Sequence, residues 1–301
     1  MRLPDFLLIG AAKSGTTALF HYLGQHPGIY ACPVREPNFF ALEGKTINFT
    51  GPGDKETVGR HSINTLAEYG QLFEDTATGQ VAGEVSPLYL YDAEAPARIR
   101  HYLPQVKLLV MLRNPVDRAY ASYLHLRRDG RESSGSFQEG LLHEDKRIGM
   151  GWEHLWHYVE MGRYATQLNR YLTQFDRSQI KILLYDDFQE APAAMLRECF
   201  EFLHVDHAFE PDFSRRPNRS GIPRSTFIQK TVAGQGWLKQ AIAGAMSEKV
   251  RGKLVSQIQK LNLSRPALDQ SIRIHLGQRY REELLELQDL IGRDLSTWLA
   301  D

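Results

Sequence analysis

The chain has 301 residues, 42% of them apolar, which is enough for one large α/β domain or two small ones with a substantial core. It carries 36 basic and 36 acidic side chains, and this net charge of zero excludes a global basic field that would recruit nucleic acid or a polyanion. The two cysteines, Cys32 and Cys199, are too far apart to suggest a disulfide framework or a metal site, and no apolar run reaches the length of a membrane span.

The first element is a strand, loop and helix in the stretch FLLIGAAKSGTTALFHYLG at residues 6–24. Its apolar start predicts a buried strand, residues 10–15 form a small-residue loop, and a helical pattern opens at Thr16. The loop amides and the first-turn N–H groups converge on one point, which the helix dipole makes electropositive. Further donors there are the side chains of Lys13, Ser14, Thr16 and Thr17. The stretch therefore predicts an anion site.

This loop differs from the nucleoside-triphosphate loop GxxxxGK[ST]. Gly10 and Gly15 have the right separation, but Thr16 stands where the motif requires lysine. No apolar strand ends in an aspartate placed as an obvious magnesium partner, so metal-dependent phosphoryl transfer lacks its second requirement. A small-metabolite kinase is thus a rival reading rather than the favoured one.

The next part of the sequence predicts two more strands, each followed by a loop or turn. Residues 29–31 predict a short strand, followed by a loop at 33–40 that carries Glu36. The glycine-rich and polar residues 44–61 predict a surface excursion, either a mobile lid or an acceptor-side loop. Then come a helix at about 62–73, a strand at 80–84 that ends in Glu84, and a helix at 92–102.

The stretch KLLVMLRNPVDRAYASYLH at residues 107–125 again combines a strand, a cation and the start of a helix. Residues 107–112 predict a buried strand with Arg113 at its carboxyl end. Asn114 and Pro115 suit the N-cap and first turn of a helix over 115–128. Two such sites at neighbouring strand ends suit a ligand with two separated anionic groups.

In the rest of the chain, predicted helices and a strand continue to alternate. This part of the sequence predicts helices near 136–147, 162–175 and 191–203, a strand at 180–185, an aromatic and histidine-rich segment at 149–158, a basic loop at 211–223, and a last helix near 276–299. We find no repeat or linker and therefore predict one domain over 1–301, with the helices of about 225–301 packed on it. This pattern predicts a P-loop-like α/β fold with a mainly parallel central sheet and helices on both faces. Ligands in such sheets bind beyond the carboxyl ends of the strands.

Together the two strand-end stretches resemble the sulfotransferases that use 3′-phosphoadenosine 5′-phosphosulfate (PAPS), which carry a KxGTT loop and an RxPxxRxxSxY segment. The similarity is closest to the heparan-sulfate type and its bacterial relatives. It continues through REPNFF at 35–40, GEVSPLYL at 83–90, GRYATQLNRYL at 162–172, IKILLYDDF at 180–188 and NRSGIPRS at 218–225.

The resemblance implies transfer of a sulfuryl group from PAPS to a hydroxyl or amine, with adenosine 3′,5′-bisphosphate (PAP) as product and no metal. It implies that Glu36 is the catalytic base and that Lys13 stabilises the leaving phosphate. It assigns the nucleotide to Lys13, Ser14, Gly15, Thr16, Thr17, Arg113, Ser122, Arg219, Gly221 and Arg224. Two departures stand out: position 121, where the family has its serine, is alanine and is followed by Ser122, and Val85 replaces a lysine of some heparan-type relatives.

The acceptor remains open between a carbohydrate, a lipid head group, a polyketide hydroxyl and a phenol, and loops 44–61 and 149–158 are expected to select it. Reserve candidates for the base are His61, His125, His154 and His157. We expect a soluble, cytoplasmic protein without a nucleic-acid partner; the oligomeric state does not follow from these motifs. A non-catalytic nucleotide-binding protein is the rival from another functional class.

Overall fold

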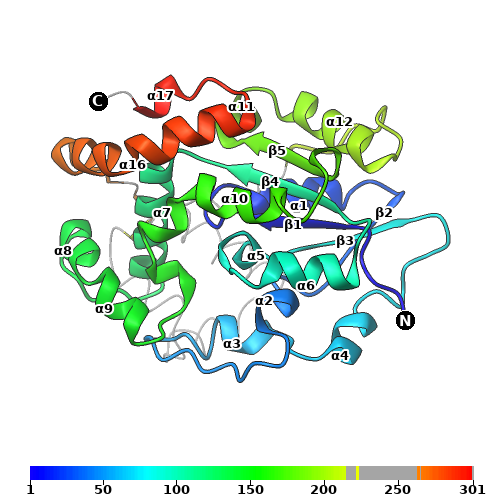
Figure 1. Ribbon diagram of the computed structural model, residues 1–301, viewed down its shortest axis with the longest axis horizontal. Coiled ribbons are helices and arrows are strands. Elements are labelled where there is room, and N and C mark those ends of the chain that lie inside the picture. Colours follow the sequence, from blue (N-terminus) through cyan, green and yellow to red (C-terminus); the bar gives the residue numbers. More distant parts are fainter. Residues whose placement is uncertain (215–221, 224–262, 265, 300–301) are drawn as a thin grey trace, which may run out of the picture.

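A parallel sheet forms the centre of the molecule (Figure 1). The computed structural model describes residues 1–214, 222–223, 263–264 and 266–299. Its five-stranded sheet has the order β2-β3-β1-β4-β5, and every pairing in it is parallel. The strands are β1 (Phe6–Gly10), β2 (Ile29–Ala31), β3 (Val81–Val85), β4 (Lys107–Leu112) and β5 (Ile180–Leu184). The predicted fold class is confirmed.

The strand order creates the ligand-binding edge. From β1 the chain runs outward to β2, returns to β3 beside β1, and then crosses to β4 and β5 on the other side. The connections therefore reverse direction around β1, and the loops that leave β1 and its neighbours separate there to open a crevice at the carboxyl edge.

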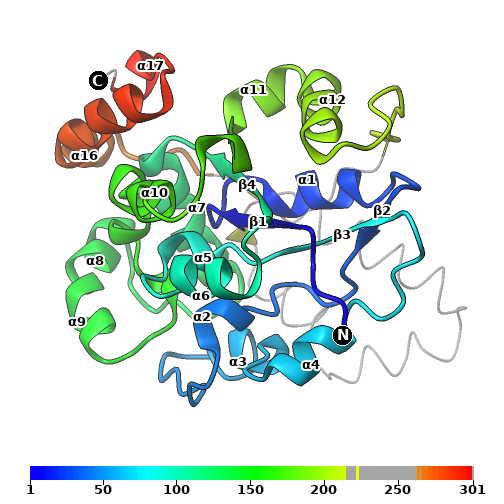
Figure 2. The same cartoon turned by 45° about the vertical axis from the view of Figure 1, so that its right-hand side comes forward.

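Helices cover both faces of the sheet (Figure 2). One face carries α1 (Thr16–Leu23), α11 (Tyr185–Glu190) and α12 (Pro192–Leu203); the other carries α5 (Leu88–Tyr91), α6 (Ala95–Tyr102) and α10 (Tyr164–Leu172). Successive residues of a strand point to opposite faces, so Phe6 and Leu8 enter the core under α1 and α12, whereas Leu7 and Ile9 enter the other core.

The remaining described elements lie around these layers. They are α2 (Phe39–Leu42), α3 (Val58–His61), α4 (Leu66–Gln71), α7 (Pro115–Arg128), α8 (Phe137–Leu142), α9 (Glu144–Gly149), η1 (His154–Trp156), η2 (Glu160–Gly162), η3 (Arg177–Gln179), α16 (Gln270–Ile291), α17 (Ser296–Leu299) and the antiparallel pair β6 (Ile222–Pro223) and β7 (Leu263–Ser264).

The late helix α16 packs on the same core as the sheet. Its buried residues Leu276, Tyr280, Leu284 and Leu287 recur at helical spacing and join the cluster that contains α10. The N–H of Thr166 on α10 donates to the Glu283 carboxylate at 3.0 Å. No helix in the described part of the chain is long and apolar enough to cross a membrane.

Two sequence-based expectations about helices were wrong. The helix expected near 276–299 is instead α16, which ends at Ile291 before Gly292 with a φ of 65°, and the separate α17. The helix expected at 136–147 is two short helices that meet at His143, and the break lets the Glu144 carboxylate turn inward to accept the N–H groups of Val159 and Glu160. The 44–61 segment lies mainly at the surface as expected, except that Asp54 within it is fully buried.

Candidate functional site

A pocket of about 560 Å³ opens at the carboxyl edge of the sheet, a volume typical of small-molecule sites. It brings together the loop after β1, the loop after β2 and the end of β4. The pocket is lined by Ala12, Lys13, Gly15, Thr16, Thr17, Ala18, Tyr22, Arg35, Glu36, Pro87, Arg113, His125, His154, Leu155, Tyr185, Phe188, Gln189, Pro192 and Phe213. Lys13, Glu36 and Arg113, which come from three separate stretches of the sequence, therefore face one cavity.

The loop after β1 is shaped to present its backbone. Gly15 has a φ of 95°, and a Cβ there would lie 2.9 Å from the ring of Tyr185, so both conformation and space require glycine. No side chain caps the first turn of α1 and no acidic residue lies in it. Its amides are thus available to an anion in the pocket.

Lys13 is a half-buried cation in this loop. Its pKa is lowered to about 8, first by desolvation and then by the nearby Arg128 and Arg113 guanidinium groups, while the Glu36 and Asp129 carboxylates act in the opposite direction. A phosphate in the pocket would relieve this repulsion among the cations. The surroundings of Lys13 therefore favour an anionic ligand.

Arg113 joins the end of β4 to the same loop. One guanidinium nitrogen donates to the Lys13 carbonyl at 3.2 Å, and the guanidinium carbon lies 4.9 Å from the centroid of the Tyr185 ring. The predicted N-cap is confirmed, since Asn114 Oδ1 accepts the N–H of Val116 at 3.0 Å. Because Asn114 already serves these amides, the anion-binding capacity at this strand end comes from Arg113 rather than from the helix terminus.

Glu36 occupies a constrained position. Its φ is 54°, in the left-handed region that costs a non-glycine residue about 1–3 kcal/mol. The conformation is held from β3, since Glu36 N–H donates to the Val85 carbonyl at 3.1 Å and Asn38 N–H donates to Ser86 Oγ at 3.1 Å. The Glu36 carboxylate raises the pKa of both Lys13 and His154, so its charge is felt by a residue on either side of the pocket.

Glu84 supports this loop from beneath. Its buried carboxylate accepts hydrogen bonds from Ser86 Oγ at 2.8 Å and from Tyr69 Oη at 3.1 Å. Burial raises the pKa of Glu84 to about 7 against the effect of these donors. Glu84 does not line the pocket, and through Ser86 and Asn38 it positions the loop that carries Glu36.

Two predicted nucleotide contacts lie elsewhere. Ser122 is fully buried, and its hydroxyl donates to the Leu155 carbonyl at 2.8 Å instead of facing the pocket, as expected for a side chain turned by one residue of helix. Ser14 is also fully buried and does not line the pocket, although its neighbours do. Arg219, Gly221 and Arg224 lie outside the described residues.

An aromatic wall completes the pocket, and sequence reasoning missed it. Tyr22 packs against Phe213 and Phe188, with ring centroids 5.0 and 6.3 Å apart, and Tyr185 stands beneath Arg113. The available signal was the sequence YDDF directly after β5, because residues that follow a parallel strand reach the ligand edge.

The four reserve histidines differ in what their ring nitrogens contact. His61 is exposed on α3 and lines neither large pocket. His125 Nδ1 lies 2.7 Å from an Arg128 nitrogen, which can only donate, and its Nε2 lies 3.5 Å from Asp129. His157 is engaged by Tyr91 Oη at 2.9 Å and the Trp152 carbonyl at 3.1 Å. His61 is therefore poorly placed, and the rings of His125 and His157 already contact other residues. Glu36 is the better candidate base. His154 is the remaining histidine.

A second pocket of about 580 Å³ adjoins the first. Loop 42–49, the segment 88–93 and residues of 151–170 line it, so the two segments expected to select an acceptor do meet. Among the described residues, His154 is the one that lines both pockets. His154 thus stands at the junction of the two spaces.

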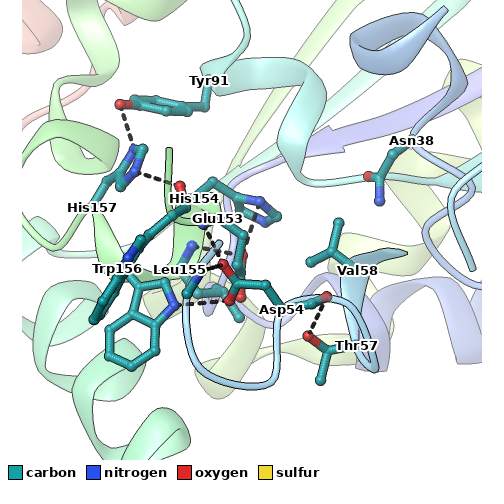
Figure 3. A network of polar contacts seen from close by, with 12 residues as sticks. Asn38, Asp54, Thr57, Val58, Tyr91, Glu153, His154, Leu155, Trp156 and His157 are labelled. Carbon is teal, nitrogen blue, oxygen red and sulfur yellow. Dashed lines mark hydrogen bonds and ion pairs between the residues drawn. The ribbon is translucent and has the colours of Figure 1, made fainter. Parts of the chain in front are cut away.

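A buried ionic network, formed by Asp54, Arg131, Glu153 and Trp156, adjoins His154. Figure 3 shows Asp54, Glu153 and Trp156 beside His154. Arg131 pairs with Asp54 and, at 3.0 Å, with Glu153. Asp54 also accepts the Trp156 indole N–H at 3.0 Å and the Glu153 N–H at 2.9 Å. The network ties the 50–59 loop to η1, which explains why that loop is packed.

No group of three or more His, Cys, Asp or Glu side chains within the described ranges is arranged to hold a metal ion. Among the described residues, the lysines and arginines that line the first pocket are Lys13, Arg35 and Arg113.

Comparison with known proteins relates the chain to one family. The model of the sulfotransferase domain family matches residues 3–214. The mouse heparan sulfate glucosamine 3-O-sulfotransferase 3B1 is 31% identical over 202 residues, which are 67% of this chain and 46% of the mouse protein. The human 3B1 protein is 30% identical over 293 residues, 97% of this chain and 64% of the human protein. The chain thus spans about half to two-thirds of the length of these relatives.

A solved structure is similar over the whole chain. The crystal structure of a sulfotransferase from Alicyclobacillus acidocaldarius is 33% identical, with a TM-score of 0.80 and coverage of 100% of both chains.

Proposed function

This chain belongs to the sulfotransferase domain family, and on that premise we propose that it transfers a sulfuryl group from PAPS to a hydroxyl or amine of an acceptor. One observation carries the proposal: Lys13, Glu36 and Arg113, a cation, a carboxylate and a second cation from three loops, line one pocket at the carboxyl edge of the sheet. The arrangement of these charges supports a donor with two anionic groups.

The first pocket suits a nucleotide with two anionic groups. The uncapped amides of α1, the Lys13 ammonium and the hydroxyls of Thr16 and Thr17 are placed for the 5′-phosphosulfate. Arg113 offers a planar guanidinium fork for the 3′-phosphate. The aromatic wall of Tyr22, Tyr185, Phe188 and Phe213 provides an apolar surface for the purine.

The chemistry needs one base and one cation. The bound donor supplies the sulfuryl group, whose bond to the phosphate oxygen breaks as a bond from sulfur to the acceptor oxygen forms. Glu36 takes the proton of the acceptor hydroxyl. Lys13 neutralises the charge that grows on the departing phosphate oxygen, as cations do in the comparable transfer of phosphoryl groups.

Two rivals make different predictions. A small-metabolite kinase binds ATP with magnesium, whereas the loop of this chain has Thr16 in place of the required lysine. A non-catalytic nucleotide-binding protein binds PAP but transfers nothing. A thermal-shift comparison of PAP with ATP and magnesium separates the first rival from our proposal, since we expect stabilisation by PAP and little by ATP.

Radiolabelled PAPS and a panel of hydroxyl and amine acceptors test the transfer itself. We expect labelled product with at least one acceptor and none without protein. If the protein binds PAP tightly yet labels no acceptor, the non-catalytic reading is correct. If it binds ATP and magnesium in preference to PAP, the kinase reading is correct.

A further inference from the structure

His154 differs from the other buried histidines because its ring stands where the two pockets meet. It is 4% exposed, and it lines both the pocket of Lys13 and Glu36 and the second pocket. Figure 3 shows it close to Glu153, with His157 directed instead toward Tyr91. A group that bridges donor and acceptor spaces is well placed to contact the atom that reacts.

The surroundings of His154 favour one tautomer. Its Nδ1 lies 3.1 Å from Glu153 Oε2 but makes no hydrogen bond there or with any other described residue, so the influence of Glu153 on it is electrostatic. Both oxygens of Glu153 accept N–H donors, Oε1 from Arg131 at 3.0 Å and Oε2 from Leu155 at 2.9 Å, so this side chain acts as an acceptor. A proton on Nδ1 is attracted to it and a lone pair there is repelled. Nε2 therefore carries the lone pair.

The ring is also neutral and firmly held. Burial lowers the pKa of His154 to about 4, so the imidazole is uncharged at neutral pH. The buried ionic network fixes the backbone on which it sits, since Asp54 accepts the Glu153 N–H. No other contact to Nε2 is found among the described residues. The result is a rigid hydrogen-bond acceptor at the junction.

The second pocket offers few free charges. The lysines and arginines in its described lining are Lys45, Arg163 and Arg170. Lys45 pairs with Glu94 at 2.6 Å, Arg163 pairs with Glu160 at 2.9 Å, and Arg170 donates to the Tyr91 carbonyl at 3.0 Å. A polysulfated chain needs unpaired cations to replace its counterions, and the described lining does not supply them.

The same lining has a surface for a ring. Phe49, Tyr91 and Trp152 contribute aromatic side chains to the second pocket. Aromatic faces pack against the apolar faces of sugars and phenols, and a volume of about 580 Å³ admits a molecule of that size.

We propose that the second pocket receives an uncharged hydroxyl compound, a glycoside or a phenol. His154 Nε2 first accepts a hydrogen bond from its reacting hydroxyl, which then turns about its C–O bond and gives the same proton to Glu36. This inference rests on the proposed sulfuryl transfer and adds its acceptor class and an acceptor-binding residue. Glu36 remains the group that removes the proton.

Two isosteric variants separate this role from a structural one. In His154→Asn the amide reaches the position of Nδ1 and keeps the contact with Glu153 but offers nothing at Nε2. In His154→Gln the amide oxygen reaches the position of Nε2 and the Glu153 contact is lost. A purely structural histidine predicts an active Asn variant and an impaired Gln variant, whereas our proposal predicts the opposite order.

The full chain is assayed with PAPS and three acceptors: methyl β-glucoside, 2-naphthol and heparan sulfate. We expect kcat/KM for a neutral acceptor at least about 10-fold above that for heparan sulfate, and a loss of about 100-fold in His154→Asn with less than about 10-fold in His154→Gln. PAP affinity and the melting temperature, measured for each variant, should stay near wild type and report correct folding. Binding of the neutral acceptors to the PAP complex by calorimetry gives a readout independent of turnover.

The outcomes are distinct. Preference for heparan sulfate, absence of calorimetric binding by either neutral compound, or an Asn variant as active as wild type overturns this inference and leaves PAPS-dependent transfer standing. A wild-type protein that does not bind PAP overturns the proposed function itself. Sulfation of the glycoside but not of the naphthol, or the reverse, identifies which neutral source the pocket accepts.

Discussion

The two pockets that share His154 are built in different ways. The first is assembled from backbone at the carboxyl ends of parallel strands, where Gly15, the α1 amides and Arg113 follow directly from local sequence. The second is walled by loops that are far apart in sequence and joined by the buried ionic network of Asp54, Arg131, Glu153 and Trp156. The first pocket is thus encoded locally and the second through long-range contacts.

Because of this difference, substitutions are expected to have different effects in the two pockets. A substitution in the donor loop alters a group aimed at the ligand, whereas a substitution in the ionic network alters the support of an entire wall. The comparison predicts that donor-side variants lose chemistry or nucleotide affinity with little change in stability, and that acceptor-side variants of the network lose stability first.

The largest effect is expected at the base. Glu36→Gln should reduce transfer by about 10³-fold, since the amide cannot take a proton, while PAP affinity stays within a few-fold. Transfer of labelled sulfate and calorimetric PAP binding check this, with the exposed Glu56→Gln as a matched control. Retained turnover in Glu36→Gln would remove Glu36 from the mechanism.

Lys13→Met should lower kcat by about 100-fold and also weaken PAP binding, because the cation faces both the ground-state phosphate and the developing charge. Lys45→Met, in the lining of the second pocket, should leave PAP affinity unchanged. Comparable losses of PAP affinity in both variants would contradict the division between the pockets.

The buried ionic network should govern stability. Asp54→Asn removes one partner of a buried pair and should cost about 3–5 kcal/mol in the free energy of unfolding, measured by urea denaturation. The control is Asp187→Asn, whose partner Arg293 is exposed, with an expected cost of less than about 1 kcal/mol. Equal costs for the two variants would show that the network does not support the wall.

Glu84 should make stability depend on pH. Its pKa is raised from 4.5 to about 7, so the folded state holds the proton more tightly than the unfolded chain, and stability is lost as pH rises between these values. Relative to Glu84→Gln, wild type should lose roughly 3 kcal/mol across this window. Urea denaturation of both proteins at several pH values measures it, and parallel curves would refute the assignment.

The smallest effect concerns Ser122. Ser122→Ala loses one hydrogen bond to the Leu155 carbonyl and should cost about 1 kcal/mol of stability with no change in PAP affinity. Thr17→Ala, which removes a hydroxyl that faces the first pocket, should weaken PAP binding instead. A loss of PAP affinity in the Ser122 variant would return that residue to the nucleotide site.

The sequence was sufficient for the fold and for the prediction that Lys13, Glu36 and Arg113 lie at one edge of the sheet. Strand and helix patterns predicted the parallel sheet, and α7 was predicted with its bounds and its Asn114 cap, because these features depend on residues close together in the chain. The position of Ser122 one residue after the alanine correctly raised the problem of helical rotation that the structure shows.

The features that the sequence did not predict depend on contacts between residues distant in sequence. The glycines and polar residues of 44–61 indicated a surface loop, since nothing local shows that Asp54 meets Arg131 and Trp156 in the interior. The aromatic cluster at 149–158 could not be divided by pattern into the core residues Trp156 and Tyr158 and the pocket residue His154. Such divisions follow from tertiary packing.

The half-buried Lys13 ammonium has a consequence for nucleotide binding. With a pKa of about 8 in the free protein, this lysine gives up its proton at a pH where an exposed lysine keeps it. A phosphate placed beside it favours the charged form, so complex formation above neutral pH draws a proton from the buffer. The heat of binding then varies with the ionisation enthalpy of the buffer, and nucleotide affinity declines in alkaline solution.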